Sequence, residues 1–388
     1  MRTMVDVFGG MMLDAVPDPY TAYTQFRREE PVVPLMGPMG PNYYVTRYDD
    51  VLAVLKNPKL FSSRANARGI GLVFGRTILE MEGREHSRHR NIVAPFFTGK
   101  AIRDELPGVI HRIAHELIDG FAGAGRAELV HDFTFTFPMR VMTHIIGIPV
   151  EDYHAFHQWA IDLVSIGDDP PRAFAAAQSI VDQLRPLFEE RRAAPTSDLL
   201  SRLLHAEVDG QRLTEDEILS FLRLLLPAGA ETTYRLIGST LFALLTHPDA
   251  YDAVRADRAA LDPVVEETLR WESPVQFCSR EITAPTALSG IALPEGAVLS
   301  LALGSANRDE RVFADPDRFD FRRDASEHLA FAFGEHFCAG SHLARLEARV
   351  ALDALLDRLP NLELVDDGDT RVVGLAFRSP NRLPVRFG

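Results

Sequence analysis

The chain has 388 residues, of which 46% are hydrophobic and 25% are charged, as in an ordinary globular protein. Its formal net charge of −14 argues against nucleic acid as a partner. It has only two cysteines, begins with no signal peptide and contains no apolar run long enough to span a bilayer, so we expect a cytoplasmic protein without a membrane anchor.

The N-terminal part is predicted to mix helix and strand. We expect a helix over residues 19–30, a strand over 42–46 and a second helix over 49–55, followed by a glycine-rich loop over 67–75. His86 and Arg90 come next, four residues apart, and would share one face of a helix. Taken alone, His86 and the nearby His89 are compatible with ordinary surface residues.

Amphipathic helices are predicted over much of residues 100–205. Breaks are expected at 123–125, 147–149, 168–171 and Pro195. On these helices His111 and His115 have the i, i+4 spacing of some zinc sites, but no third ligand is evident. His154 and His157 are interpreted as part of an exposed helix face.

A long buried helix is predicted from Thr214 to about His247. It starts with a capping box formed by Thr214 and Glu217, and leucines surround it. The run Pro-Ala-Gly-Ala-Glu-Thr-Thr (227–233) is expected to kink the helix or open a turn. Glu231 and Thr232 place an acid and an alcohol side by side there, and these groups could relay protons. The alternative is a proline-kinked core helix with one buried acid.

An acid and a base follow in Glu267 and Arg270, which lie three residues apart and therefore on one helix face. The plain interpretation of this pair is a solvated surface ion pair that contributes little to stability. Short β segments are expected around residues 297–303 and over 371–386. No linker, charge block or repeat marks a boundary, so we expect residues 1–388 to form a single domain.

Cys338 lies in the run Phe-Ala-Phe-Gly-Glu-His-Phe-Cys-Ala-Gly (331–340), directly before a predicted helix. A sulfur at a helix N-terminus faces unpaired N–H groups and the positive end of the macrodipole, which favour the thiolate. Gly334 allows a tight turn, and Gly340 lets a flat cofactor approach the backbone. The context indicates a metal-bound thiolate, whereas a free cysteine in general is most often a small core residue.

This pattern, Phe-x-x-Gly-x-x-x-Cys-x-Gly, resembles the proximal loop of the cytochrome P-450 family, the haem-thiolate monooxygenases. The resemblance covers essentially the whole chain, because two further motifs of the family precede the loop in the family's order. It implies a mainly α, triangular haem-thiolate fold with a minor β-rich portion, of the bacterial soluble type. It also implies haem b (heme b, iron protoporphyrin IX) as cofactor, with Cys338 as the metal ligand. Ala332 is a departure, because the family usually has a second glycine there.

The resemblance further implies roles for residues around the cofactor. The run 228–232 is similar to the oxygen-binding motif of the family, with Glu231 and Thr232 at the oxygen site as catalytic residues. The two haem propionates need cationic or hydrogen-bonding partners. The cofactor-binding residues implied in this way are His86, Arg90, Ala228, Gly229, Arg280, Phe331, Gly334, His336, Cys338 and Gly340.

Glu267 and Arg270 resemble two members of the buried Glu-Arg-Arg cluster that lies under the proximal loop in the family. Arg318, in Pro-Asp-Arg-Phe (316–319), looks like the third member. If buried, these charges must satisfy one another, and their role is structural.

By resemblance, the protein is an enzyme that inserts one oxygen atom from O2 into a small to medium hydrophobic substrate. Electrons would come from a separate ferredoxin and ferredoxin reductase, since the chain has no room for a fused reductase domain. Two alternatives are a peroxide-driven enzyme of the same fold, which usually lacks the acid–alcohol pair, and a non-catalytic haem sensor. The arginines that could dock the partner, or simply form solvated helix faces, are Arg88, Arg103, Arg345 and Arg349.

Apolar residues occupy the segments that line the substrate pocket in the family, which suggests a hydrophobic molecule of modest size. These residues are Ile70, Leu72, Val73, Phe74, Leu224, Ala228, Val275, Gln276, Phe277, Ala376 and Phe377.

Overall fold

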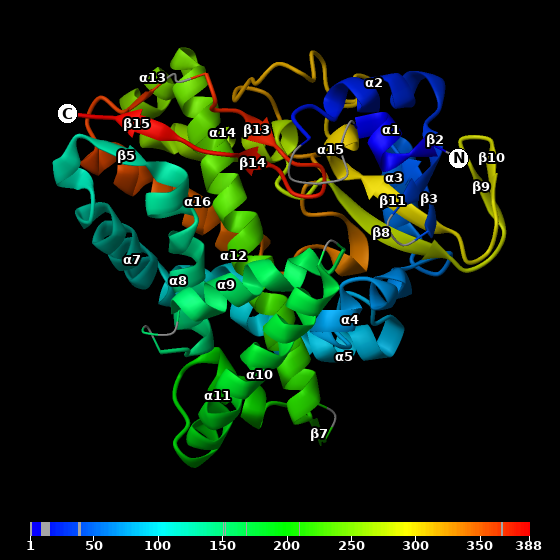
Figure 1. The fold of residues 1–388 in the computed structure, drawn as a ribbon, viewed down its shortest axis with the longest axis horizontal. Coiled ribbons are helices and arrows are strands. Elements are labelled where there is room, and N and C mark those ends of the chain that lie inside the picture. The colour runs from blue at the N-terminus through cyan, green and yellow to red at the C-terminus, as the bar shows by residue number, and fades with distance from the viewer. Residues whose placement is uncertain are drawn as a thin grey trace.

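The computed structural model describes residues 2–8, 16–37, 40–149, 151, 153–167, 169–208, 210–365 and 368–388. In Figure 1 a larger helical part adjoins a smaller β-rich part on the side of the N-terminus, and the outline is roughly triangular. The chain is therefore mainly α with minor sheets, as the sequence predicts.

The main sheet joins the N-terminal segment to strands from much later in the chain, in the order β1-β2-β3-β11-β8-β4. β3 and β11 pair in parallel, and β8 runs antiparallel to β11 with Arg280 opposite Leu299. The six strands are β1 (Arg2–Thr3), β2 (Val32–Gly37), β3 (Gly40–Val45), β4 (Phe61–Ser62), β8 (Phe277–Ile282) and β11 (Val298–Ala302).

The other strands are short and form small sheets of two or three strands. They are β5 (Arg126–Glu128), β6 (Glu207–Val208), β7 (Gln211–Arg212), β9 (Thr286–Leu288), β10 (Ile291–Leu293), β12 (Glu363–Leu364), β13 (Val372–Val373), β14 (Ser379–Pro380) and β15 (Pro384–Arg386).

Helices form the body of the molecule, and their apolar faces meet in one large buried cluster to which α7, α8, α9, α10, α12, α14 and α16 contribute. A second cluster lies between α3 and the main sheet. The helices are α1 (Met4–Phe8), α2 (Tyr20–Glu29), α3 (Tyr48–Lys56), α4 (Gly71–Phe74), α5 (Gly83–Val93), α6 (Gly99–Glu105), α7 (Pro107–Asp119), α8 (Thr136–Ile146), α9 (Tyr153–Val164), α10 (Pro170–Ala193), α11 (Leu199–His205), α12 (Glu215–Thr246), α13 (Pro248–Ala256), α14 (Leu261–Trp271), α15 (Leu303–Ala306) and α16 (Ser341–Arg358).

The long helix α12 crosses the molecule from the end near β7 to the end near α14 (Figure 1). Its capping box is present as predicted: the Thr214 side chain accepts from the Glu217 N–H, and Glu217 Oε2 accepts from the Thr214 N–H at 2.7 Å. Pro227 lies inside the helix, yet the helix is continuous from Glu215 to Thr246. The expected opened turn therefore does not interrupt it, because packing on several sides holds the backbone helical.

Two predictions about local structure are wrong. The stretch 67–75 is not simply a loop, since a 3₁₀ helix ends at Arg68 and α4 follows at Gly71–Phe74, where burial of Val73 and Phe74 offsets the weak helix propensity of glycine. His157 is not exposed: it is 5% exposed and its ring packs 3.7 Å from that of Phe135, centroid to centroid. His154 is exposed, as predicted.

Candidate functional site

The loop that carries Cys338 is closed by backbone hydrogen bonds. The Cys338 N–H donates to the Phe331 carbonyl at 3.1 Å, and α16 begins three residues after Cys338, at Ser341. The cysteine therefore lies just ahead of a helix N-terminus, as predicted. Gly334 has a φ of 79°, and a Cβ on it would approach the Leu55 carbonyl oxygen to 2.9 Å. A glycine is required at this turn for both reasons.

Ala332 adopts the same left-handed backbone region as Gly334, with a φ of 57°. A side chain is disfavoured there because Cβ approaches the backbone too closely. Having alanine instead of glycine at position 332 therefore costs conformational energy, which the sequence alone did not reveal.

The Cys338 side chain is exposed, and a Cβ on Gly340 would lie 4.0 Å from its sulfur. Desolvation by the surrounding residues raises the pKa of the thiol, while the backbone N–H groups of Gly340 and Ser341 and the charges of Arg90 and Arg345 lower it. The helix terminus and the cations thus favour the thiolate, but without a bound metal the pKa of the thiol is still raised above its usual value. A bound metal ion would deprotonate the thiol outright.

Four basic side chains from three elements meet beside this loop. His86 and Arg90 come from α5, Arg280 from β8 and His336 from the cysteine loop. The rings of His86 and His336 lie 4.4 Å apart, centroid to centroid. Burial lowers the pKa of both histidines, that of His336 to about 3, and the neighbouring arginines lower it further.

The two arginines of this cluster form no ion pair with a described carboxylate, whereas Nε2 of His336 lies 3.8 Å from Glu335 Oε1. Arg90 Nη2 donates to the Phe337 carbonyl at 2.5 Å and Arg280 Nη1 to the Ser279 carbonyl at 2.8 Å. Nε2 of His86 and Nε2 of His336 are buried without a hydrogen-bond partner among the described residues. Buried donors and cations of this kind need an anionic ligand.

One face of α12 borders solvent-accessible space in the middle of the molecule. Ala228 is exposed and Thr232 is partly exposed, and the Thr232 hydroxyl donates to the Ala228 carbonyl at 2.7 Å. A Cβ on Gly229 would instead approach Met142 Sδ of α8 to 2.5 Å. The lack of a side chain at position 229 therefore makes room for helix packing, rather than for a ligand on the open face.

Glu231 does not share the open face with Thr232, because it is only 4% exposed. Its Oε2 accepts from Arg235 Nη2 on the next turn at 3.4 Å. Arg235 also donates to Ser379 Oγ at 3.2 Å, and its guanidinium lies 5.5 Å from the centre of the Phe377 ring. The acid is thereby linked to the C-terminal segment 377–379, a contact that the sequence motif did not reveal.

Glu267 and Arg270 form the buried pair that the resemblance predicted, since both side chains are fully buried and two hydrogen bonds of 2.7 Å join them. Arg270 also binds the carbonyls of Asn307, Pro316 and Arg318. This pair therefore holds the irregular segment between α15 and the cysteine loop.

The third arginine of the cluster is Arg323, and the prediction of Arg318 is wrong. Arg318 is exposed and contributes only its backbone carbonyl. Arg323 Nε lies 3.4 Å from Glu267 Oε1, and its side chain is 13% exposed. The family spacing pointed to the right segment, but the path of the irregular chain decides which of its arginines turns inward.

A second clamp joins α14 to the cysteine loop. Glu266 accepts from Arg345 Nη2 at 2.9 Å and lies 3.2 Å from His328 Nε2, and the Arg345 guanidinium lies 4.6 Å from the centre of the Phe331 ring. Burial alone would raise the pKa of Glu266, but these partners lower it to about 2. The only sequence signal for this clamp was that Glu266 adjoins Glu267 and that Arg345 follows the cysteine by two helical turns.

The other charged candidates lie apart from this cluster. Among the described residues no group of three or more histidine, cysteine or acidic side chains is arranged to hold a metal ion, which leaves the zinc alternative at His111 and His115 without support. Of the docking candidates, Arg349 pairs with Asp262 at 3.0 Å, whereas Arg103 is exposed.

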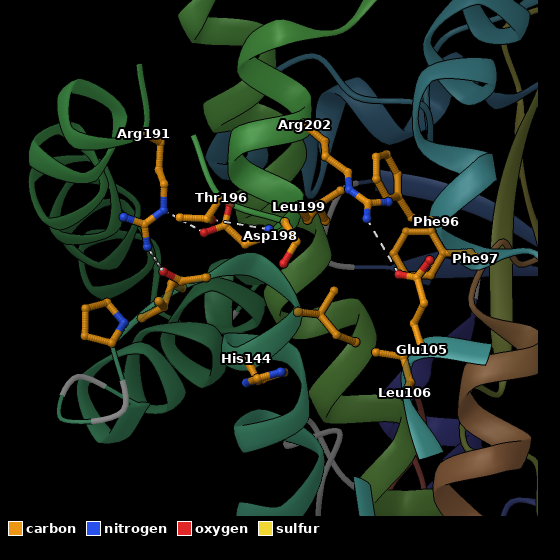
Figure 2. Close-up of a pocket in the computed structure, with 15 residues that line it drawn as sticks. Phe96, Phe97, Glu105, Leu106, His144, Arg191, Thr196, Asp198, Leu199 and Arg202 are labelled. Atoms are coloured by element: carbon orange, nitrogen blue, oxygen red, sulfur yellow. Dashed lines mark hydrogen bonds and ion pairs between the residues drawn. The ribbon is translucent and has the colours of Figure 1, made fainter. Parts of the chain in front are cut away.

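A separate cavity of about 670 Å³ opens between α8, α10 and α11 (Figure 2). Figure 2 shows that its cations are already engaged, Arg191 with Asp198 and Arg202 with Glu105. None of the predicted site residues lines it.

Comparison with known proteins gives the family. The family model described as Cytochrome P450 matches residues 166–370. Cytochrome P450 monooxygenase PikC of Streptomyces venezuelae is 38% identical over 365 residues, which cover 92% of this chain and 87% of that protein. The chain is a cytochrome P450.

Other similar proteins agree with this P450 assignment. Vitamin D(3) 25-hydroxylase of Pseudonocardia autotrophica is 36% identical, with 99% of this chain and 96% of that protein covered. The structure of cytochrome P450 CYP109Q5 from Chondromyces apiculatus superposes with a TM-score of 0.88 at 38% identity, covering 96% of this chain and 95% of that one. This P450 is thus a haem-thiolate monooxygenase with bacterial relatives, an oxidoreductase that uses O2 and an organic substrate. No described helix has the length and apolar character needed to cross a membrane.

The basic cluster fits the cofactor that the family implies. Haem carries two propionates, and these are the anions that Arg90, Arg280 and the two buried Nε2 atoms lack. Cys338 would supply the sulfur ligand, and its thiol lies close enough to Arg90 for that charge to lower the thiol pKa.

Proposed function

We propose that this P450 binds haem b with Cys338 as the thiolate ligand and with His86, Arg90, Arg280 and His336 around the propionates. The observation that carries this proposal is that Arg90 and Arg280, which form no ion pair with a described carboxylate, converge with the buried Nε2 atoms of His86 and His336 beside Cys338. Phe331, Gly334 and Gly340 shape the cysteine loop, Ala228 lies on the open face of α12 toward the cofactor, and Gly229 lets α12 pack against Met142 behind that face. When bound, the haem supplies O2 activation and one-electron chemistry.

The residues of α12 then have the role of proton delivery. The Thr232 hydroxyl is held on the open face by its bond to the Ala228 carbonyl, where it can order water. The Glu231 carboxylate is buried behind it and held by Arg235, so proton transfer between Glu231 and Thr232 requires either a water molecule or a rotation of Glu231. We assign Glu231 and Thr232 as the catalytic residues of this relay.

The substrate in this proposal is a small to medium hydrophobic molecule. Two of the expected lining segments meet in the fold, since Val275 and Phe377 form a β-bridge and the Gln276 N–H donates to the Ala376 carbonyl at 2.9 Å. Leu72 of α4 is 57% exposed, so its apolar side chain is accessible to such a molecule.

A ferredoxin and its ferredoxin reductase are the proposed electron donors, in the cytoplasm, to a single domain spanning residues 1–388. With a net charge of −14, this chain can attract an acidic ferredoxin only through a local basic surface. Arg345 and Arg349 are already paired with Glu266 and Asp262, so Arg88 and Arg103 are the better candidates for that surface.

The test is spectroscopic. Purified protein is expected to contain one haem b, and its ferrous carbon monoxide complex is expected to show the red-shifted Soret band of thiolate ligation. Cys338→Ala should lose that band. A histidine-type spectrum in folded protein, or ligation unaffected by Cys338→Ala, would contradict the assignment. Turnover with ferredoxin and its reductase, compared with turnover with peroxide, separates the monooxygenase from the peroxide-driven alternative.

A further inference from the structure

Arg223 is a partly buried cation on α12 whose charge has no counterion. Its Nη2 is 3.4 Å from Ser220 Oγ, a long contact, and its Nε is buried without a hydrogen-bond partner among the described residues. It forms no ion pair with any described carboxylate. Burial lowers its pKa, and only Asp216, two turns earlier on the helix, acts in the opposite direction. An uncompensated cation in such a place is unfavourable unless a ligand supplies the negative charge.

Asp216, the acid that acts on Arg223 through its charge, is exposed and forms no described ion pair with it. Glu80, which lies against Gly71 of α4, pairs with Arg76 at 3.8 Å. Farther along α12, the partly buried Arg235 has Glu231 as its acid. Arg223 thus differs from the other partly buried arginine of its helix in having no ion-pair partner among the described residues.

The guanidinium of Arg223 lies where α4 ends. Gly75, directly after α4, has a φ of 80°, and a Cβ on it would come within 2.4 Å of Ser220 Oγ and 3.0 Å of Arg223 Nη2. A side chain at position 75 would therefore collide with Arg223 and the serine that contacts it. On α4 the apolar side chain of Leu72 is exposed, whereas Leu224, which follows Arg223 on α12, is buried.

We propose that Arg223 binds the carboxylate of the substrate, so that this P450 oxidises a monocarboxylic acid with an apolar body. A guanidinium with free donors matches a carboxylate in charge and in geometry, and the apolar side chains beside it suit the remainder of the molecule. The inference rests on the proposed function, because it takes α4 and α12 as walls of the substrate pocket.

The position of Arg223 also predicts where the acid is oxidised. Arg223 precedes Thr232 by nine residues of one continuous helix, which corresponds to roughly 13 Å along its axis. Oxidation is therefore directed to carbons far from the carboxylate, and a hydroxylation next to the carboxylate would contradict this placement.

The experiment is an optical titration of the haem-loaded protein, following the Soret shift on displacement of the distal water. The probes are decanoate, tetradecanoate and octadecanoate, each compared with the alcohol and the methyl ester of the same chain. The wild type should bind at least one acid about 10- to 100-fold more tightly than its alcohol and ester, the range expected for charge-assisted hydrogen bonds. Equal binding of acid and alcohol throughout the series, or no binding of any acid, overturns the proposal without any need for a variant.

Variants then assign the preference to Arg223. Arg223→Gln should abolish the preference for the acid over its alcohol and ester, and Arg223→Lys should keep part of that preference. Arg202→Gln is the control, because Arg202 lines the separate cavity of Figure 2, and it should leave the preference unchanged. An acid preference that persists in Arg223→Gln overturns the assignment. The carbon monoxide spectrum is recorded first on every protein, so that loss of the thiolate band identifies a failure of the proposed function instead.

Discussion

Ala332 shows at the scale of one residue why the cysteine loop favours glycine. Its φ of 57° lies in the left-handed region, where an alanine is strained by about 1 kcal/mol. The turn is nonetheless formed, because the Ala332 N–H donates to the Leu329 carbonyl at 2.9 Å and the surrounding loop holds the backbone.

Ala332→Gly is therefore expected to stabilise the protein by roughly 0.5–1 kcal/mol, since glycine adopts this conformation without a Cβ clash. Reversible urea unfolding would measure the change. Gly334→Ala is the matched control and should destabilise the protein, because it adds a Cβ 2.9 Å from the Leu55 carbonyl oxygen at a positive φ. A loss of stability in Ala332→Gly would show that the strain is absent.

Thr232 is the residue through which the proton relay can be tested. Thr232→Ala should leave haem content and substrate affinity nearly unchanged, because the side chain is small and its hydroxyl binds only a backbone carbonyl among the described residues. The yield of product per reducing equivalent should fall, and released peroxide should rise, because proton delivery loses its ordered alcohol. Thr233→Ala, at a buried position, is the neighbouring control. An unchanged yield in Thr232→Ala would exclude this threonine as the relay alcohol.

At the scale of elements, α14 holds the cysteine loop through two adjacent acids. Glu267 turns toward Arg270, Arg323 and the N–H of Asp320, while Glu266 turns toward Arg345 at the start of α16. Neighbouring helix positions diverge by about 100°, so consecutive acids can support different segments.

Removal of either partner from the buried pair of Glu267 and Arg270 should strongly destabilise the protein. Glu267→Ala or Arg270→Ala is expected to cost about 3–5 kcal/mol, since each leaves a charge buried without its partner. Little soluble, haem-loaded protein should result. Arg318→Ala should remain within roughly 0.5 kcal/mol of wild type, because that side chain is exposed. Normal haem loading in both pair variants would mean that the pair does not support the loop.

The Glu266 clamp predicts a pH-dependent contribution to stability. Its folded pKa of about 2 lies below the unfolded value of about 4.3, so the charged form is favoured in the folded protein. The stabilisation is complete above pH 4.3 and is lost as the pH falls from about 4 toward 2.

Glu266→Gln should therefore lower the free energy of unfolding at pH 7 by roughly 1–2 kcal/mol, a range that allows for solvent screening of a partly exposed pair. The difference from wild type should be constant between pH 7 and pH 5 and should narrow below pH 4. Urea titrations at these pH values would measure it. A difference that grows as the pH falls would contradict the assignment.

At the scale of the whole molecule, the proposed haem contacts join three elements that lie far apart in the sequence. His86 and Arg90 lie in the helical part, Arg280 on the β-rich side and His336 in the cysteine loop. The lowered pKa values keep both histidines neutral near pH 7, so the charges that should repel each other when the propionates are removed are those of Arg90 and Arg280, which have no described carboxylate partner.

Removal of the haem is thus expected to lower the melting temperature by several degrees or more, since a tightly bound ligand stabilises the folded state by mass action. Hydrogen exchange should rise first in α5, β8 and residues 331–340. If the hydrogen-exchange rate rose equally over the whole chain, with these three segments no more affected than α7, the proposed contacts would be contradicted.

The sequence by itself determined the features that depend on local rules. The capping box at Thr214 and Glu217 starts α12, Gly334 occupies a turn that needs a positive φ, and Cys338 precedes a helix, as predicted. These outcomes follow from backbone geometry and hydrogen bonding within a few residues. The motif order was likewise sufficient for the family.

The tertiary structure decided everything that depends on which side chains meet. It turned Arg323 inward where spacing suggested Arg318, buried His157, and placed Gly229 against Met142. It also linked Glu231 through Arg235 to segment 377–379, and left Arg223 without an acid. Such pairings depend on how irregular segments and separate helices pack, and no local pattern encodes them.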